Sequence, residues 1–207
     1  MTDAYRFDES STEQAIAYAK IYAGENYSPA METVLKVAFS EKRNLPTFRL
    51  KSSDTILLSG YMKKWVGAYL AGYNNRPSVR TGNCSGTHPD PMAKTILRAR
   101  ISGLEDNLAD KIVAGHSLLM TIENNIGELL EEYLSVKLSP LGWYCCWGST
   151  IDAVDFCKAD GSLLQIKTSD NSENSSSSRV RQGTPIGKWF RRFSRRCINQ
   201  SAHILFS

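Results

Sequence analysis

Three polar residues in two short apolar runs have the types needed to hold a divalent metal beside a phosphate. Asp152 lies in the run 151–156, and Gln165 and Lys167 lie in a second run, 163–167. Carboxylate and amide oxygens are hard ligands that suit Mg²⁺, and a bound metal lowers the pKa of its water. A lysine at the same place can orient that water or stabilise the leaving charge. The pattern predicts metal-dependent hydrolysis of a phosphodiester.

The turn between the two runs sets their register. Asp160-Gly161 between apolar segments predicts a β-hairpin with a two-residue turn, because a type I′ turn needs positive φ at both positions. That loop sets Ala159 opposite Ser162. Side chains alternate between the faces of a strand, and cross-strand partners share a face, so the register decides which side chains meet.

In this register Asp152 shares a face with Gln165 and Lys167, and Asp155 points to the other face. A loop of three residues would reverse the outcome and bring Asp155 to the site instead. The alternative interpretation is an ordinary surface hairpin with a polar outer face, because the pattern is short and common.

The residues after the hairpin have the composition of a nucleic-acid contact. The run 168–178 is rich in Ser and Asn, and 179–196 contains seven Lys or Arg and no acidic residue. Lys and Arg neutralise phosphates, and Ser, Asn and Arg side chains read base edges. A flexible linker and a solvated helix face are the alternative interpretations. The candidate DNA-binding residues are Asn171, Asn174, Ser175, Ser176, Ser177, Arg179, Arg181, Lys188, Arg191 and Arg192.

The stretch from Asp152 to Gln165-Ile166-Lys167 resembles the PD-(D/E)xK nuclease motif, although Gln165 departs from the usual Asp or Glu. The longer run 163–195 resembles the SinI family of type II restriction endonucleases. The resemblance implies an α/β fold with a PD-(D/E)xK restriction-endonuclease-like core, in which helices flank a mixed central β-sheet, and an N-terminal helical region.

The same resemblance implies a Mg²⁺-dependent endonuclease that cuts double-stranded DNA at a short GC-rich site of the GGWCC kind. A DNA methyltransferase that protects the host is then a genetic rather than a physical partner. A site read with two-fold symmetry implies a homodimer.

Several enzymes of this class supply an auxiliary glutamate from a helix before the hairpin. The segment 116–138 has an apolar helical stripe, and Glu123 borders it. We therefore expect Asp152, Gln165 and Glu123 to bind the metal, with Lys167 completing the catalytic set. The alternative for Glu123 is a solvated helix surface.

Apolar periodicity and capping residues predict the remaining elements. We expect an N-terminal, mostly helical region over 1–115, packed on a catalytic core over 116–207 that carries the basic segment. The family likeness fades after Ser194, so we expect the chain to be shortened or altered there. The expected helices are 11–23, 29–40, 54–72, 92–100, 104–114, 116–138 and a short basic helix at 186–196, with a strand at 143–147.

Composition excludes several other classes. The chain has 207 residues, 42% of them hydrophobic, and a net charge of +4. Its five Cys form no CxxC pair and its three His are scattered, which indicates reduced thiols rather than a zinc or disulfide framework. The sequence shows neither a signal peptide nor a membrane-spanning run, so we expect a bacterial cytoplasmic protein. A non-catalytic nucleic-acid-binding protein and a repair nuclease without a fixed site are the competing hypotheses.

Overall fold

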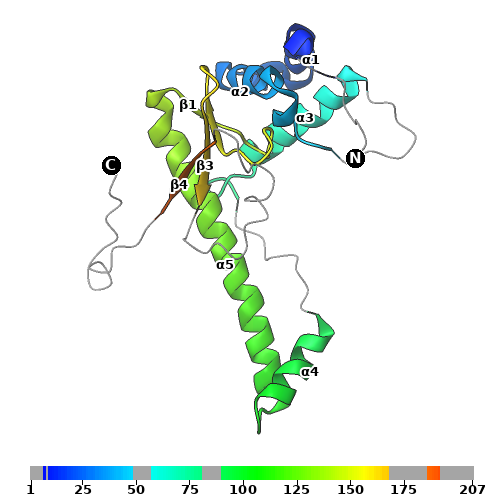
Figure 1. Ribbon diagram of the computed structural model, residues 1–207, viewed down its shortest axis with the longest axis vertical. Helices are drawn as coiled ribbons and strands as arrows, with labels where there is room; N and C mark the ends of the chain where they lie inside the picture. The colour runs from blue at the N-terminus through cyan, green and yellow to red at the C-terminus, as the bar shows by residue number, and fades with distance from the viewer. Residues whose placement is uncertain (1–6, 8, 49–56, 81–89, 168–185, 192–207) are drawn as a thin grey trace. The chain divides into compact units, whose positions relative to one another are not determined.

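The computed structural model describes residues 7, 9–48, 57–80, 90–167 and 186–191, which form two compact units (Figure 1). Unit 1 contains the chain up to Asn75 and from Tyr133 onward, and unit 2 is Arg76–Glu132. The elements are the 3-10 helices η1 (Glu9–Ser11), η2 (Gly24–Asn26), η3 (Lys42–Asn44) and η4 (Ser139–Leu141), the helices α1 (Thr12–Ala23), α2 (Pro29–Ser40), α3 (Leu58–Asn74), α4 (Pro91–Arg100) and α5 (Asp106–Leu138), and the strands β1 (Trp143–Cys145), β2 (Phe156–Lys158), β3 (Leu163–Lys167) and β4 (Ile186–Phe190).

Helix α2 begins where the sequence supplies both a cap and a rigid first turn. The Ser28 side chain accepts a hydrogen bond from the Met31 N–H at 3.2 Å, and Pro29 occupies the first helical turn. Met31, Leu35 and Ala38 are buried at helical spacing, so one face of α2 enters the core. The helix lies against β1 and β2 (Figure 1).

The four strands form one mixed sheet in the order β1-β2-β3-β4. The pairs β1–β2 and β2–β3 are antiparallel, whereas β3 and β4 are parallel. Tyr144, Cys157, Leu163 and Ile186 are partners across the strands, and all four belong to or pack against the main hydrophobic core. Helices therefore cover this face of the sheet. Gln165 and Lys167 of β3 lie on the same face as Leu163.

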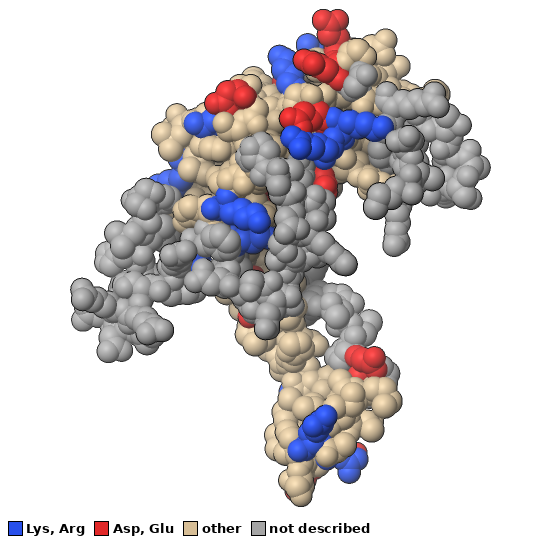
Figure 2. Space-filling model, viewed as in Figure 1, with Lys and Arg blue, Asp and Glu red and all other residues tan. Residues whose placement is uncertain are grey.

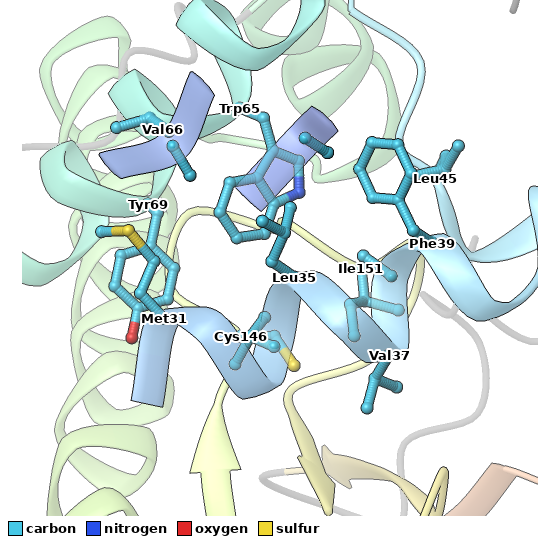
Figure 3. Packing of buried hydrophobic residues seen from close by; sticks show 14 of the residues in the cluster. Met31, Leu35, Val37, Phe39, Leu45, Trp65, Val66, Tyr69, Cys146 and Ile151 are labelled. Atoms are coloured by element: carbon cyan, nitrogen blue, oxygen red, sulfur yellow. The ribbon is translucent and has the colours of Figure 1, made fainter. Parts of the chain in front are cut away.

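Helices α2 and α3 share their core with the loop between β1 and β2. Figure 3 shows Trp65 and Tyr69 of α3 beside Met31 and Leu35 of α2. The two α3 rings are stacked, with centroids 5.8 Å apart. The buried Trp65 Nε1–H donates to the Thr150 carbonyl oxygen at 2.9 Å. The indole thus satisfies its one donor and fixes the loop that leads to β2.

Two glycines allow the same loop to touch the backbone of α3. Gly148 has a φ of +69°, and a Cβ there would lie 2.0 Å from the Ala68 carbonyl oxygen. A Cβ on Gly72 would lie 2.4 Å from the Gly148 nitrogen. Both positions need a residue without a side chain, because the contact is between backbones.

Unit 2 holds α4 and the longer part of α5. The Asp90 side chain caps α4 by accepting from the Met92 N–H at 2.8 Å. Lys94 of α4 pairs with Asp110 at 2.8 Å and with Asp106 at 3.6 Å, which ties α4 to the first turns of α5. Across the described residues, no helix has the length and apolar character needed to cross a membrane.

The structure confirms a mixed α/β fold and most of the expected helices, and it corrects two others. The segments 104–114 and 116–138 are not separate helices, because α5 runs through both without a break. The short basic helix expected at 186–196 is wrong: residues 186–190 form β4, which pairs with β3 along its whole length. Ile186 and two aromatic residues in these five positions favour a strand, and 192–196 lie outside the described residues. The functional boundary at residue 115 stays a prediction.

Candidate active site

The loop between β2 and β3 has three residues rather than two. Lys158 donates its N–H to the Ser162 carbonyl at 2.9 Å, and Gly161 donates to the Lys158 carbonyl at 3.0 Å. Gly161 has a φ of +85°, whereas Asp160, which a type I′ turn would also place at positive φ, does not. The expected two-residue turn is wrong, because a single left-handed glycine closes a three-residue hairpin loop.

This loop brings Asp155, and not Asp152, level with Gln165. Phe156 pairs with Leu164, so Asp155, which directly precedes β2, faces Gln165 of β3. The Asp155 N–H donates to the Leu164 carbonyl at 3.0 Å, which extends the pairing beyond the end of β2. The alternative register, in which Asp155 joins the polar face of β3, is the one that the structure adopts.

The Asp155 carboxylate also takes part in the backbone pairing. Its Oδ2 accepts a hydrogen bond from the Ile166 N–H at 2.6 Å, in place of a backbone carbonyl of β2. Asp155 therefore has a position fixed by two strands, and its side chain lies between the residues that flank Ile166, namely Gln165 and Lys167.

Asp152 lies outside the sheet, in the turn before β2. Its N–H donates to the Asn44 carbonyl at 2.9 Å, and the buried Asn44 side chain donates to the Val37 carbonyl at 2.9 Å. Ala153, with a φ of +57°, turns the chain away from an extended course. The expected placement of Asp152 on a strand opposite β3 is thus wrong, and its catalytic role stays a prediction.

The surroundings of Asp155 favour its neutral form. Burial of the carboxyl group raises its pKa above the ordinary value, and this effect outweighs the Ile166 hydrogen bond and the charge of Lys167, which both lower the pKa. Buried carboxyl groups with raised pKa values are frequent at active sites. A cation beside Asp155 would oppose the burial effect and favour the carboxylate.

This raised pKa predicts a stability change with pH. Between the ordinary carboxyl pKa and the raised one, the folded protein binds more protons at Asp155 than the unfolded chain does, so stability falls as pH rises. We expect Asp155→Asn to remove this loss, so that in EDTA the variant gains stability relative to the wild type as the pH rises above the ordinary carboxyl pKa of about 4. Urea midpoints measured at each pH test the difference.

Asp160→Asn is the matched control on the same hairpin. Hydrogen bonds from Ser162 lower the pKa of Asp160, so this group stabilises the folded protein above the ordinary carboxyl pKa and loses the effect as pH falls. The stability of Asp160→Asn relative to the wild type should therefore change with pH in the opposite direction to that of Asp155→Asn. A flat difference for Asp155→Asn would contradict the proposed burial effect.

Gln165, Lys167 and Lys188 line one side of the parallel strand pair. Gln165 is only 6% exposed and is the partner of Lys188 across β3 and β4. Lys167 is half-buried, and its carbonyl accepts from the Arg191 N–H at 2.9 Å. The sheet therefore collects a half-buried carboxyl group, a buried amide and two ammonium groups along adjacent segments.

The expected DNA-binding residues lie mainly outside the described part of the chain. Lys188 is exposed on β4 and Arg191 directly follows it. On the face seen in Figure 2, the Lys and Arg side chains of the described residues stand in small groups, several of them beside Asp or Glu. The remaining candidates, which the structure does not describe, are Asn171, Asn174, Ser175, Ser176, Ser177, Arg179, Arg181 and Arg192.

Glu123 belongs to unit 2, where its side chain is exposed on α5. The apolar stripe beside it is exposed at Ile122, Leu129 and Tyr133, whereas Leu130 of the same stripe is buried, so the stripe enters the core only in part. The role of Glu123 as an auxiliary metal ligand stays a prediction.

The side chains at the hairpin fit a hard cation. Asp155, directly before β2, and Gln165 of β3 provide a carboxylate and an amide oxygen close to one another, and Mg²⁺ prefers one or two protein oxygens completed by water and phosphate. In the described part of the chain, no three His, Cys, Asp or Glu side chains gather into a metal-binding group. The free thiols of Cys145, Cys146 and Cys157 are buried, as expected.

The mixed sheet thus brings together an acid directly before β2 with an amide and a lysine on β3, the residue types that the sequence pattern associates with a metal-dependent nuclease. Residues 52–202 match the family described as SinI restriction endonuclease, and the chain belongs to this family.

Two curated relatives share part of the sequence. The chain is 46% identical over 115 residues to the type II restriction enzyme SinI of Salmonella infantis, an alignment that covers 53% of this chain and 50% of the relative. It is 44% identical over 115 residues, with the same coverage, to the type II restriction enzyme Eco47I of Escherichia coli. The chain thus spans about half the length of the curated relatives it matches.

Proposed function

We propose that this protein is a type II restriction endonuclease that hydrolyses double-stranded DNA at a specific sequence and requires Mg²⁺. The observation that carries the proposal is the position of Asp155 beside Gln165 and Lys167, within the segment that matches the SinI family. The fold of this segment is then a variant of the PD-(D/E)xK core, with Gln165 in place of the second acid.

Asp155 and Gln165 would hold the metal through one carboxylate oxygen and the amide oxygen. Oδ2 of Asp155 already accepts from Ile166, which leaves Oδ1 for the cation. Bound there, Mg²⁺ supplies an acidified water and neutralises charge on the phosphate. Asp155 thus replaces Asp152 in the role that the sequence pattern assigned to the latter, and Glu123 remains the candidate for an additional carboxylate.

Lys167 lies on the same side of β3 as Gln165, two residues further along. We assign two roles to its ammonium group. It would orient the attacking water for in-line displacement at phosphorus, and it would stabilise the charge that develops on the phosphate oxygens. Because its backbone carbonyl is held by Arg191, the lysine is positioned by β4 as well as by β3.

The proposed partners follow from the same function. Double-stranded DNA would contact the Ser-, Asn- and Arg-rich segment that links β3 to β4, together with Lys188 and Arg191. The recognised site is short and GC-rich, of the GGWCC kind. The enzyme acts as a homodimer in the bacterial cytoplasm, and a DNA methyltransferase of matching specificity protects the host.

Cleavage of phage DNA by the full chain tests this function. We expect Mg²⁺-dependent fragments whose mapped ends share one short sequence, and Lys167→Ala should lower the rate by about 10²–10⁴-fold. Fragments with random ends would indicate a repair nuclease instead. Binding without cleavage, equally strong in wild type and Lys167→Ala, would indicate a non-catalytic DNA-binding protein. Cleavage that persists at the wild-type rate in Lys167→Ala refutes the role of the lysine.

A further inference from the structure

One side of α5 carries a regular apolar stripe in unit 2. Successive positions are separated by four and three residues in strict alternation, which is the 3.5-residue period of two helices that wind around each other. Five of these side chains are 40% to 54% exposed. The positions are Leu108, Ile112, Gly115, Leu119, Ile122, Ile126 and Leu129.

The contacts within unit 2 lie on the opposite side of α5. Lys94 binds Asp110, Arg80 pairs with Glu128 at 3.5 Å, and Ala109 is fully buried. On a helix of 3.6 residues per turn, Asp110 and Glu128 point about 150° away from the middle of the stripe, and Ala109 points about 100° away from it. The charged contacts of α5 within unit 2 therefore lie away from the stripe, and the described residues of unit 2 leave most of the stripe exposed.

The exposed stripe is large enough for a protein interface. Its apolar side chains, with Leu118 beside them at 59% exposure, present roughly 600 Å² per copy, the upper end of the patches that single proteins leave in contact with water and the lower end of the area that each partner buries in a stable dimer. In Figure 2 the surface over unit 2 is mostly uncharged on the face in view.

The stripe is complementary to itself in the antiparallel direction. When two copies of α5 cross between Met120 and Thr121, Leu119 of one meets Ile122 of the other, and Gly115 meets Ile126. The residue without a side chain thus lies opposite a large one, whereas a parallel pair would place Gly115 against itself and leave a gap. A Cβ on Gly115 would have no atom of the described residues within 4 Å, so the described part of unit 2 does not fill that position.

We propose that this stripe is an antiparallel seam between two copies of the chain. Such a contact is isologous, since the same surface of both copies is used and each pair occurs twice. The proposal identifies where the homodimer forms and is independent of the proposed cleavage, because dimerisation is measured on the protein without DNA or metal.

Leu119→Glu and Ala114→Glu form a matched pair for the first test. Both place a carboxylate on the exposed surface of α5, but only Leu119 lies in the stripe. By light scattering after gel filtration, we expect the wild type and Ala114→Glu to be dimers, and Leu119→Glu to dissociate at least about 30-fold more readily, the loss typical of a central interface residue. A monomeric wild type, or an equally dimeric Leu119→Glu, would overturn the proposal.

Disulfide cross-linking tests the direction even if Leu119→Glu fails to fold. A mixture of Gly115→Cys and Ile126→Cys chains should form a covalent dimer whose bond joins positions 115 and 126 in a mass spectrum. Gly115→Cys alone should not link to itself, since the two positions are about 16 Å apart in an antiparallel pair. Linkage between two copies of position 115 would show a parallel seam, and no linkage in the mixture would exclude this contact.

Discussion

Asp155→Asn lowers the Mg²⁺-dependent cleavage rate at least about 10²-fold, because it removes the charge of the proposed Asp155–Gln165 metal site, and the loss of mere supporting groups around a metal already lowers activity about 10- to 100-fold. Asp152→Asn leaves most of the activity, since Asp152 lies in the turn before β2 and not on the sheet. Initial rates on supercoiled plasmid, measured over a range of Mg²⁺ concentrations, distinguish the two variants.

The amide is a suitable replacement because it retains an oxygen that can accept the Ile166 hydrogen bond. A folded but inactive Asp155→Asn variant thus separates the loss of charge from the loss of the strand contact. We expect its activity to recover partly at high Mg²⁺, whereas a purely structural defect would not respond to the metal. The opposite ranking, with Asp152→Asn inactive and Asp155→Asn active, would return the catalytic role to Asp152.

Gly148→Ala lowers the free energy of unfolding by at least about 3 kcal/mol, from the strain of a left-handed alanine and the overlap of its Cβ with α3 together. The overlap is with the Ala68 carbonyl, a backbone atom that cannot rotate away. Since whole domains have only about 5–15 kcal/mol of stability, we expect little folded protein at growth temperature. Urea unfolding, followed by tryptophan fluorescence, measures the change.

Gly142→Ala is the control that isolates the steric effect. Gly142 has a φ of +78°, similar to that of Gly148, but a Cβ there meets no atom within 4 Å. Its variant should lose only the backbone term, about 1–2 kcal/mol. Equal losses at the two positions would mean that the loop moves away from α3 without difficulty.

Elements with a strong local signal were predicted well from sequence. Helix α2 was expected at 29–40 and spans Pro29–Ser40, because Ser28, Pro29 and a helical apolar face all act within one segment. The strand β4 was missed because its partner decides its state. Ile186 and the two aromatic residues of β4 favour a strand, but the basic residues that follow suggested a helix, and the parallel pairing with β3 fixes these residues as a strand.

The choice of acid at the candidate site depended on whether the hairpin loop has two residues or three. Gln165 and Lys167 were expected on one face, and β3 confirms this because alternation is a local property of any strand. The acid was assigned to Asp152 because Asp160-Gly161 favours a two-residue turn. The structure instead closes the loop with Gly161 alone, and this one-residue difference exchanges the two aspartates.

Half of the main core comes from residues that precede the family match. Ala15, Met31 and Phe39 lie in α1 and α2, before residue 52, yet they bury Trp65 and the sheet residue Cys157. A fragment cut at the boundary of the matched segment would expose these side chains to solvent and would tend to aggregate rather than fold. The helical N-terminus is therefore part of the same folding unit as the sheet that carries the candidate site.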